Sequence, residues 1–468
     1  MSFARADWKI PACAALALCA GCATQPSSAP PPLSAATSAA SYDARSLRDE
    51  GLRRFLAENL GSVPAADWDF ETLSWVAFYF HPSLELARAQ WATARAVERS
   101  AGVRPNPTLT FTPGYNSTRV PGVSPWMPGI NFDFLFPTAG KRGHQQAIAR
   151  SEAEAVRLAV FSAAWQIRGE LRRALTDAAS ASRREAILRT QAETQRKLVA
   201  LLEQRFTAGS VAATDVLPVR TALLRAESAG AEAASQATIT RARVAAALGL
   251  SLAALDGVTL PIPPPRSLSP EALAAARRES LQSRADLLAA LAKYHSAQSA
   301  LELEVAKRVP DFHLGPGYQW DQGSNKWTLG ISFEIPIFHR NEAPIAEATA
   351  RRAEAAAQFN VVQAQAIAAI DSASAAQGAA TMQLSRTRQL RAEIETQSAL
   401  VQQRFELGAA DQVEVQTARL EVATAELAVI EAENAGAGVA GQLEDALQIP
   451  FPRFALLADA APAQSRTP

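Results

Sequence analysis

The sequence predicts an α+β fold in which one unit, a β-hairpin followed by two very long helices, is written twice in tandem. Three sequence blocks recur in the same order and at nearly the same spacing in the two halves of the chain. One block in each half alternates apolar and polar residues, as strands do, and a long stretch without proline follows it. The two halves are therefore expected to fold alike.

The N-terminus predicts export. Residues 1–21 have the form of a secretory signal, because Arg5 and Lys9 precede a short apolar run that ends in small residues. The run Leu18-Cys-Ala-Gly-Cys22 resembles a lipobox, which makes Cys22 the expected lipidation site; the alternative is an ordinary cleaved signal with chance cysteines. All cysteines lie in this leader, so no internal disulfide is expected in the mature chain. Residues 22–43, rich in Pro, Ser and Ala, are predicted to be a lipidated tether.

Composition narrows the class of protein. Of the 468 residues, 48% are hydrophobic but only 7% are aromatic. Much of the hydrophobic content is alanine, whose small side chain suits long, closely packed helices. The net charge of zero gives no basic excess that would attract nucleic acid. No glycine-rich nucleotide loop and no paired acid–base groups are present, so neither an enzyme nor a cofactor is expected. No mature segment is apolar for long enough to be a transmembrane helix, so a closed barrel is the remaining way to cross a membrane.

The repeats are predicted at 44–260 and 283–448, with a linker or equatorial segment at 261–282 and a C-terminal tail at 449–468. Two blocks carry the alignment around the hairpins: both segments 104–115 and 308–318 end in Pro-Gly-Tyr, and segments 126–134 and 327–335 both begin with Trp. The third block is the sequence Gln-Arg-Phe-x-x-Gly, which ends at Gly209 in the first repeat and at Gly408 in the second.

Each repeat is predicted to contain one hairpin, at 107–137 and 310–338, because period-two alternation with aromatic and branched residues on one face indicates strands. One face of each hairpin is apolar and the other polar, as a lipid-facing wall requires. The residues expected to face lipid are Ile130, Phe132, Phe134, Ile331, Phe333 and Ile335. Those expected to face the lumen are Asn131, Asp133, His313, Ser332 and Glu334.

Long helical hairpins are predicted at 141–248, with its tip near 209, and at 343–447, with its tip near 408. From 144 to 208 the chain has no proline and a single glycine, and a helix of that length would run roughly 95 Å. Such a length favours a coiled coil over a globular helix. Pro218 is expected to kink the first returning helix. Shorter helices are expected before each hairpin, near 82–103 and 283–308.

This pattern resembles the outer-membrane efflux protein family, the TolC-like exit ducts. Its most specific parts are the two Arg-Phe-x-x-Gly turns and the block Phe136-Pro-Thr-Ala-Gly-Lys-Arg142. The run Pro336-Ile-Phe-His-Arg-Asn341 with Trp320 and Trp327 looks most like the heavy-metal efflux (CusC/CzcC) branch. Because four strands cannot close a barrel alone, several chains must share one. The resemblance implies a homotrimer with a twelve-stranded β-barrel in the outer-membrane lipid, continued by a periplasmic α-helical coiled-coil barrel.

The tips are the expected docking site for a periplasmic adaptor, since nothing in either repeat lies beyond them. The alternative for Asp215 and Glu414 is helix capping, and for the two arginines it is closing helical carbonyls; these stay open. The residues of the expected docking site are Arg205, Phe206, Gly209, Val211, Asp215, Arg404, Phe405, Gly408, Ala410 and Glu414.

Metal binding by the chain is not expected. His313 and His339 flank the second hairpin near Asp311, but no histidine pair has ligand spacing, and a solvated His313 is the better interpretation. Asp133 and Glu334 occupy equivalent positions, so three chains would form acidic rings that favour cations, or simply a wet, polar interior.

The expected function is the exit duct of a tripartite efflux pump, in which the chain passively conducts solutes from the pump and adaptor to the exterior, heavy-metal cations being one candidate cargo. The expected partners are an adaptor (membrane fusion) protein and an inner-membrane pump of the RND type, as the family resemblance implies. The alternatives are a multidrug or type I secretion duct of the same fold, and a structural or adhesive coiled-coil lipoprotein.

Overall fold

The computed structural model describes residues 34–61, 68–118, 121–264 and 269–449, and the chain divides into two compact units, Met1–Arg45 and Ser46–Pro468. In the first unit the described residues form α2 (Ala35–Asp43). The predicted tether is therefore helical at its C-terminal end, where alanine, the best helix former, is frequent. The signal at 1–21, Cys22 and nearly all of the predicted tail lie outside the described residues.

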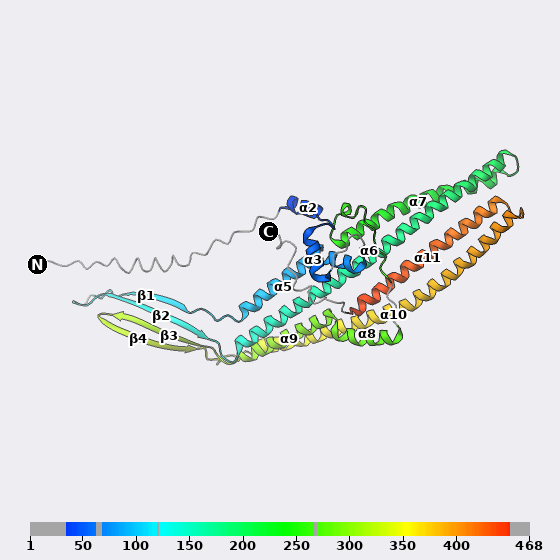
Figure 1. Ribbon diagram of the computed structural model, residues 1–468. Coiled ribbons are helices and arrows are strands. Elements are labelled where there is room, and N and C mark those ends of the chain that lie inside the picture. Colours follow the sequence, from blue (N-terminus) through cyan, green and yellow to red (C-terminus); the bar gives the residue numbers. More distant parts are fainter. Residues whose placement is uncertain (1–33, 62–67, 119–120, 265–268, 450–468) are drawn as a thin grey trace. The chain divides into compact units, whose positions relative to one another are not determined.

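The second unit contains one antiparallel sheet in the order β1-β2-β3-β4 (Figure 1). Its strands are β1 (Thr108–Tyr115), β2 (Trp126–Phe136), β3 (Phe312–Asp321) and β4 (Ser324–Phe333), which lie within the two predicted hairpins. The hairpins are joined through β2 and β3, where Ile130 pairs with Tyr318 and Phe136 with Phe312. The outer strands β1 and β4 have no further strand partner among the described residues.

Two long helical hairpins follow the strand pairs. In the first repeat α6 (Lys141–Thr207) packs against α7 (Ala213–Leu248), and in the second α10 (Glu342–Glu406) packs against α11 (Gln412–Leu447) (Figure 1). At 1.5 Å per residue the 67 residues of α6 extend about 100 Å. Helix α7 includes Pro218 in its second turn and continues to Leu248. Among the described residues no helix is long and apolar enough to cross a membrane.

Equivalent backbone conformations mark the start of both long helices. Gly140 before α6 and Asn341 before α10 are both left-handed, with φ of 72° and 61°. Glycine adopts this conformation freely, and asparagine is among the residues that tolerate it. The Asn341 side chain also donates to the Glu304 backbone carbonyl at 2.7 Å, which fixes α10 to the shorter helix α9 (Ala285–Ala306). The corresponding short helix of the first repeat is α5 (Pro82–Ala101).

The largest hydrophobic core lies where α3 (Glu50–Leu60) and α4 (Phe70–Phe80) pack with α6, α7 and the short 3-10 helix η1 (Leu252–Leu255). Neither α3 nor α4 was among the predicted helices. Trp75, Phe55 and Phe78 of these helices are among the largest fully buried side chains. Because nearly every residue of α4 is buried, its sequence lacks the polar stripe by which a helix is recognised.

The segment 261–282, predicted as a linker or equatorial segment, contains most of α8 (Pro270–Ser283). Ser269 caps this helix by accepting a hydrogen bond from the backbone N–H of Ala272, and Pro270 occupies the first turn, where its missing N–H costs nothing. The proline-rich run before residue 265 concealed this start signal.

Candidate transport and docking surfaces

One face of the sheet is apolar across all four strands. The strand register aligns Leu109 with Phe132, Leu314 with Ile331 and Tyr318 with Trp327, all on this face. Trp126 and Trp327 each contact the aromatic ring of the tyrosine opposite, with centroids 5.0 and 4.9 Å apart. The predicted lipid-facing residues Ile130, Phe132, Phe134, Ile331 and Phe333 all lie on this face and are exposed.

The opposite face is mainly polar. It brings together the predicted lumen residues Asn131, Asp133, His313 and Ser332. The His313 Nδ1 atom lies 2.9 Å from Asp133 Oδ2, so the imidazole and this carboxylate contact each other across β2 and β3. Within the described ranges no three His, Cys, Asp or Glu side chains are grouped as metal ligands would be.

Glu334 and Ile335 do not continue β4, contrary to the sequence prediction. The strand ends at Phe333, which pairs with Phe312, the first residue of β3. Beyond that pair the described sheet offers no backbone partner, and Pro336 lacks an N–H group with which to pair. The paired strand therefore ends one residue before Glu334 and two before Ile335, so the alternation that assigned Glu334 to the lumen and Ile335 to lipid extends beyond it.

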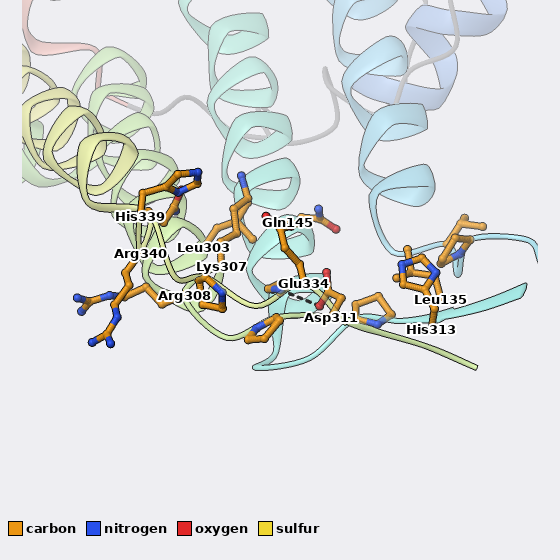
Figure 2. A pocket seen from close by; sticks show the side chains of 17 residues that line it. Leu135, Gln145, Leu303, Lys307, Arg308, Asp311, His313, Glu334, His339 and Arg340 are labelled. Carbon is orange, nitrogen blue, oxygen red and sulfur yellow. Dashed lines mark hydrogen bonds and ion pairs between the residues drawn. The ribbon is translucent and has the colours of Figure 1, made fainter. Parts of the chain in front are cut away.

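A cavity of about 740 Å³ opens where the strands meet the helices (Figure 2). Glu334 and His313 contribute to its lining, but four basic side chains outnumber the two carboxylates there. The charged lining residues are Lys141, Lys307, Arg308, Arg340, Asp311 and Glu334. The prediction of an acidic ring that includes Glu334 finds no support in this basic surrounding.

Lys141 and Asp311 connect the two repeats where the strands meet the helices. The buried Lys141 ammonium donates to Asp311 Oδ1 and to the Val309 backbone carbonyl, both at 2.7 Å. The Thr138 backbone N–H donates to the same carboxylate oxygen at 2.7 Å, and its hydroxyl donates to the Pro310 carbonyl at 2.8 Å. These bonds fix the start of the second hairpin to the start of α6.

The tips of the two helical hairpins contact each other within the chain. Arg205, at the end of α6, donates to Asp411 Oδ2 at 3.0 Å, just before α11 begins. Behind this ion pair Leu198, Leu202 and Val216 form a small buried cluster. The predicted docking residue Val211 packs against that cluster together with Val219, Val413 and Leu420 from both repeats. The first and second tips are therefore joined by an ion pair and by apolar contacts.

Asp215 and Glu414 cap the returning helices, which was one of the two interpretations left open. The Asp215 carboxylate accepts from the Ala212 backbone N–H at 3.1 Å, and Glu414 accepts from that of Asp411 at 3.4 Å. Asp411 itself accepts from the backbone N–H groups of Val413 and Glu414. These donors, the Glu414 N–H foremost, together with Arg205, lower the pKa of Asp411.

The turn residues have the geometry that the sequence predicts. Gly209 and Gly408 have φ of 73° and 74°, a conformation that side chains resist. The Arg404 guanidinium donates to the Ala409 carbonyl at 3.1 Å and lies 3.9 Å from Glu414, both of them residues of its own tip. Phe206 and Phe405 stay exposed, and Ala410 is partly buried.

One buried charge cluster was missed by the sequence reasoning. Glu444 of α11 forms ion pairs with Arg168 and Arg172 of α6, at 2.6 Å for Arg172, and its side chain is only 5% exposed. Both guanidinium groups also stack on the Phe70 ring. Burial raises the pKa of the neighbouring Asp445 to about 6, against the opposing effect of Arg173. No local signal identifies these residues, because the partners are 276 residues apart.

Comparison with known proteins supports the fold and the duplication. The family model described as outer membrane efflux protein matches residues 80–250 and 276–447, one segment in each repeat. No curated protein sequence matches the chain.

Three solved structures illustrate the likeness. VceC of Vibrio cholerae is 22% identical, with a TM-score of 0.67 over 81% of this chain and 95% of that one. CusC, described for its transmembrane channel formation, is 17% identical, with a TM-score of 0.66 over 82% and 95%. The open state of the Neisseria gonorrhoeae outer membrane channel MtrE is 17% identical, with a TM-score of 0.65 over 81% and 88%.

The expected fold class is thus confirmed as a mostly helical, internally duplicated chain with a small four-stranded sheet, and a trimer is consistent with the family. Members of this family are outer-membrane channels and not enzymes. The similarity to CusC is no greater than that to VceC and does not single out a heavy-metal branch. Since the family model covers most of both repeats, the chain belongs to the outer membrane efflux protein family.

Proposed function

We propose that this chain is the outer-membrane exit duct of a tripartite efflux pump, and that three copies form one passive channel. The observation that carries the proposal is the sheet: one face is apolar and exposed, the other is mainly polar, and both outer strands are unpaired within the described residues. A closed barrel built from several such sheets would turn the apolar face to lipid and the polar face to an aqueous lumen.

Docking of an adaptor at the tips is part of the proposal. Members of the family work with an adaptor and an inner-membrane pump, and we assign the adaptor to the surface around the two glycine turns. The exposed aromatic rings of Phe206 and Phe405 and the open space around both glycines support this assignment. An RND-type pump is the proposed partner, as expected from the sequence resemblance.

For the cargo of the duct, we propose two candidate classes rather than one solute. A heavy-metal cation, suggested by resemblance to the CusC/CzcC branch, has Asp133 in its favour and the basic cavity at the strand–helix junction against it. A duct that leaves cargo selection to its pump agrees with both observations. A multidrug or type I secretion duct is therefore an equal candidate, and the pump beside it would decide.

Lipid anchoring at Cys22 is proposed from the lipobox alone, since that segment lies outside the described residues. Mass spectrometry of the mature protein is expected to find an acylated N-terminal Cys22. The acyl chains would add membrane affinity to an inserted barrel, so Cys22→Ala is expected to weaken anchoring while insertion remains. An unmodified N-terminus at another residue would rule the anchor out.

Conductance separates the duct from a structural or adhesive spacer. Purified trimers added to a planar lipid bilayer are expected to produce discrete, long-lived conductance steps, because a shared barrel provides a continuous aqueous path. A spacer that merely attaches to the surface leaves the current at baseline. Fluorescently labelled protein shows that trimers have inserted, so a silent bilayer with inserted trimers would contradict the proposal.

A further inference from the structure

We propose that the cavity where the strands meet the helices binds a phosphate-type oxyanion, held by the guanidinium groups of Arg308 and Arg340. The proposal rests on the assignment of the chain as a duct and adds a class of solute that the duct would hold at this level. Three observations support it: the excess of basic side chains around the cavity, the partners of those side chains, and the face of the sheet that the cavity adjoins.

Two of the four basic side chains that line the cavity are already paired with carboxylates. Lys141 donates to Asp311 at 2.7 Å, and Lys307 lies 2.7 Å from Glu304. Asp311 also accepts from the backbone N–H of Thr138 at 2.7 Å and from its hydroxyl at 3.2 Å. The Asp311 and Glu304 carboxylates are therefore engaged by groups other than the two arginines.

Arg308 and Arg340 have no such partner. Within the described ranges neither guanidinium forms an ion pair or a hydrogen bond, and both side chains are exposed. Glu334 also lines the cavity and is likewise unpaired in this part of the chain, so it is a competing charge rather than a partner. A single unpaired arginine on a surface is ordinary. Two that line one cavity provide a pair of planar, permanently charged donor groups, which fit the oxygen atoms of a phosphate or carboxylate.

The two arginines lie on segments that are bonded to each other. Arg308 follows α9, and its backbone N–H donates to the Val305 carbonyl at 3.2 Å. Arg340 precedes Asn341, whose side chain donates to the Glu304 carbonyl of α9 at 2.7 Å. In Figure 2 the side chains of Arg308 and Arg340 lie on the same side of the junction. Because the two backbone segments are held together, less conformational freedom is lost when both arginines bind one anion.

The cavity adjoins the polar face of the sheet. Its lining includes Leu135 and His313, which pair at the helix end of β2 and β3, and His313 contacts Asp133 on that face. Exposed apolar side chains such as Phe134 lie on the opposite face. A lipid phosphate would have to approach from the apolar face, whereas a solute in the proposed lumen reaches the cavity directly. A soluble anion, such as inorganic phosphate or a phosphorylated solute, is therefore the expected occupant.

Such a site would affect the ions that pass through the duct. Rings of charged side chains set the ion preference of a pore, and in a trimer the arginine pair would be present three times at the same level. The unoccupied guanidinium groups would attract chloride. A bound phosphate would neutralise them, so phosphate is expected to lower the chloride current.

Conductance of trimers in a phosphatidylcholine bilayer tests the site. The reversal potential in a potassium chloride gradient gives the chloride selectivity, and inorganic phosphate is then titrated at constant ionic strength. The chloride current of the parent is expected to fall and to saturate with phosphate. In Arg308→Gln with Arg340→Gln, the half-blocking concentration is expected to rise by about tenfold or more, since a hydrogen bond to a charged group is worth at least that factor. An unchanged half-blocking concentration would overturn the site.

Three further variants separate oxyanion binding from a general effect of charge. Arg308→Lys with Arg340→Lys keeps both charges but not the planar groups, so chloride selectivity is expected to persist while the phosphate block weakens. Glu334→Gln removes the competing carboxylate and is expected to lower the half-blocking concentration. The control is Lys326→Gln, at the far end of the second hairpin, which is expected to leave the block unchanged. Equal block in the lysine variant and the parent would contradict recognition by the arginines.

Phosphatidylglycerol added to the bilayer distinguishes a lipid phosphate from a soluble one. At high ionic strength this anionic lipid is expected to leave the block by inorganic phosphate unchanged. If the lipid abolishes the block, headgroups occupy the site and the assignment to a solute is wrong. Inserted trimers that carry no current would contradict the proposed duct itself, whereas conducting trimers that do not respond to phosphate would contradict only the anion site.

Discussion

Replacing Glu444 with alanine is expected to lower the free energy of unfolding by about 3–5 kcal/mol, the usual cost of leaving buried charge unpaired. The Glu444 carboxylate is the shared partner of Arg168 and Arg172, whose side chains are only 13% and 8% exposed. Arg172 would keep its bond to the Pro264 carbonyl, but both guanidinium groups would lose the carboxylate that they share. The measurement is loss of the helical circular-dichroism signal with denaturant in detergent.

Glu431→Ala is the matched control for this prediction. Glu431 lies on the same helix and, like Glu444, pairs with an arginine of α6. The side chains of Glu431 and its partner Arg184 are, however, 64% and 45% exposed. Exposed ion pairs contribute about 0–1 kcal/mol, so this variant is expected to unfold almost as the parent does. Similar losses for Glu444→Ala and Glu431→Ala would show that burial of the cluster does not determine its contribution.

Replacing both tip glycines with valine is expected to abolish export while leaving the trimer and its insertion intact. Gly209 and Gly408 adopt positive φ, where a branched side chain is strained by about 1–3 kcal/mol each, although no atom lies within 4 Å of either added Cβ. The strain is therefore expected to reshape the turns rather than to unfold the helices. Export is measured as retention of fluorescent dyes by cells and as tolerance to drugs and metal salts.

Gly61→Val controls for backbone strain alone. Gly61 ends α3 with φ of 76° and, like the tip glycines, has nothing within 4 Å of an added Cβ. It carries the same conformational requirement at a position away from the tips. Loss of export in Gly61→Val as well would mean that the strain acts through folding. Full export in the double tip variant would remove the tips from pump docking.

The sequence predicted the repeated elements well, because each has a local pattern that can be recognised without knowledge of its tertiary contacts. Alternation around Ile130 and Phe132 indicated strands, and the proline-free runs indicated the long helices. The same reasoning missed α4, whose burial on all sides removes the amphipathic pattern. The predicted strand also extended beyond Phe333, where β4 ends, because the alternation of apolar and polar residues continues in the sequence after the last paired residue.

The candidate site was less accessible to sequence reasoning. Glu414 was identified as a tip residue, but Asp411 was not, although an acidic residue three positions before a glutamate is a recognisable helix start. Its ion pair with Arg205 joins residues 206 positions apart and depends on how the two repeats pack. The same is true of Lys141 with Asp311, where burial and backbone carbonyls define the contact. Such contacts follow from tertiary packing, which one sequence does not display.

Export by the source bacterium is the most direct test of the duct. The gene would be deleted in a strain that lacks its other outer-membrane efflux channels, and retained dye, drug and metal ion would be measured with and without the wild-type chain. Deletion is expected to raise retention of at least one cargo class, and the wild-type chain is expected to restore export. Unchanged retention of every class, in cells where the wild-type chain is present in the outer membrane, would contradict the assignment of the chain as an exit duct.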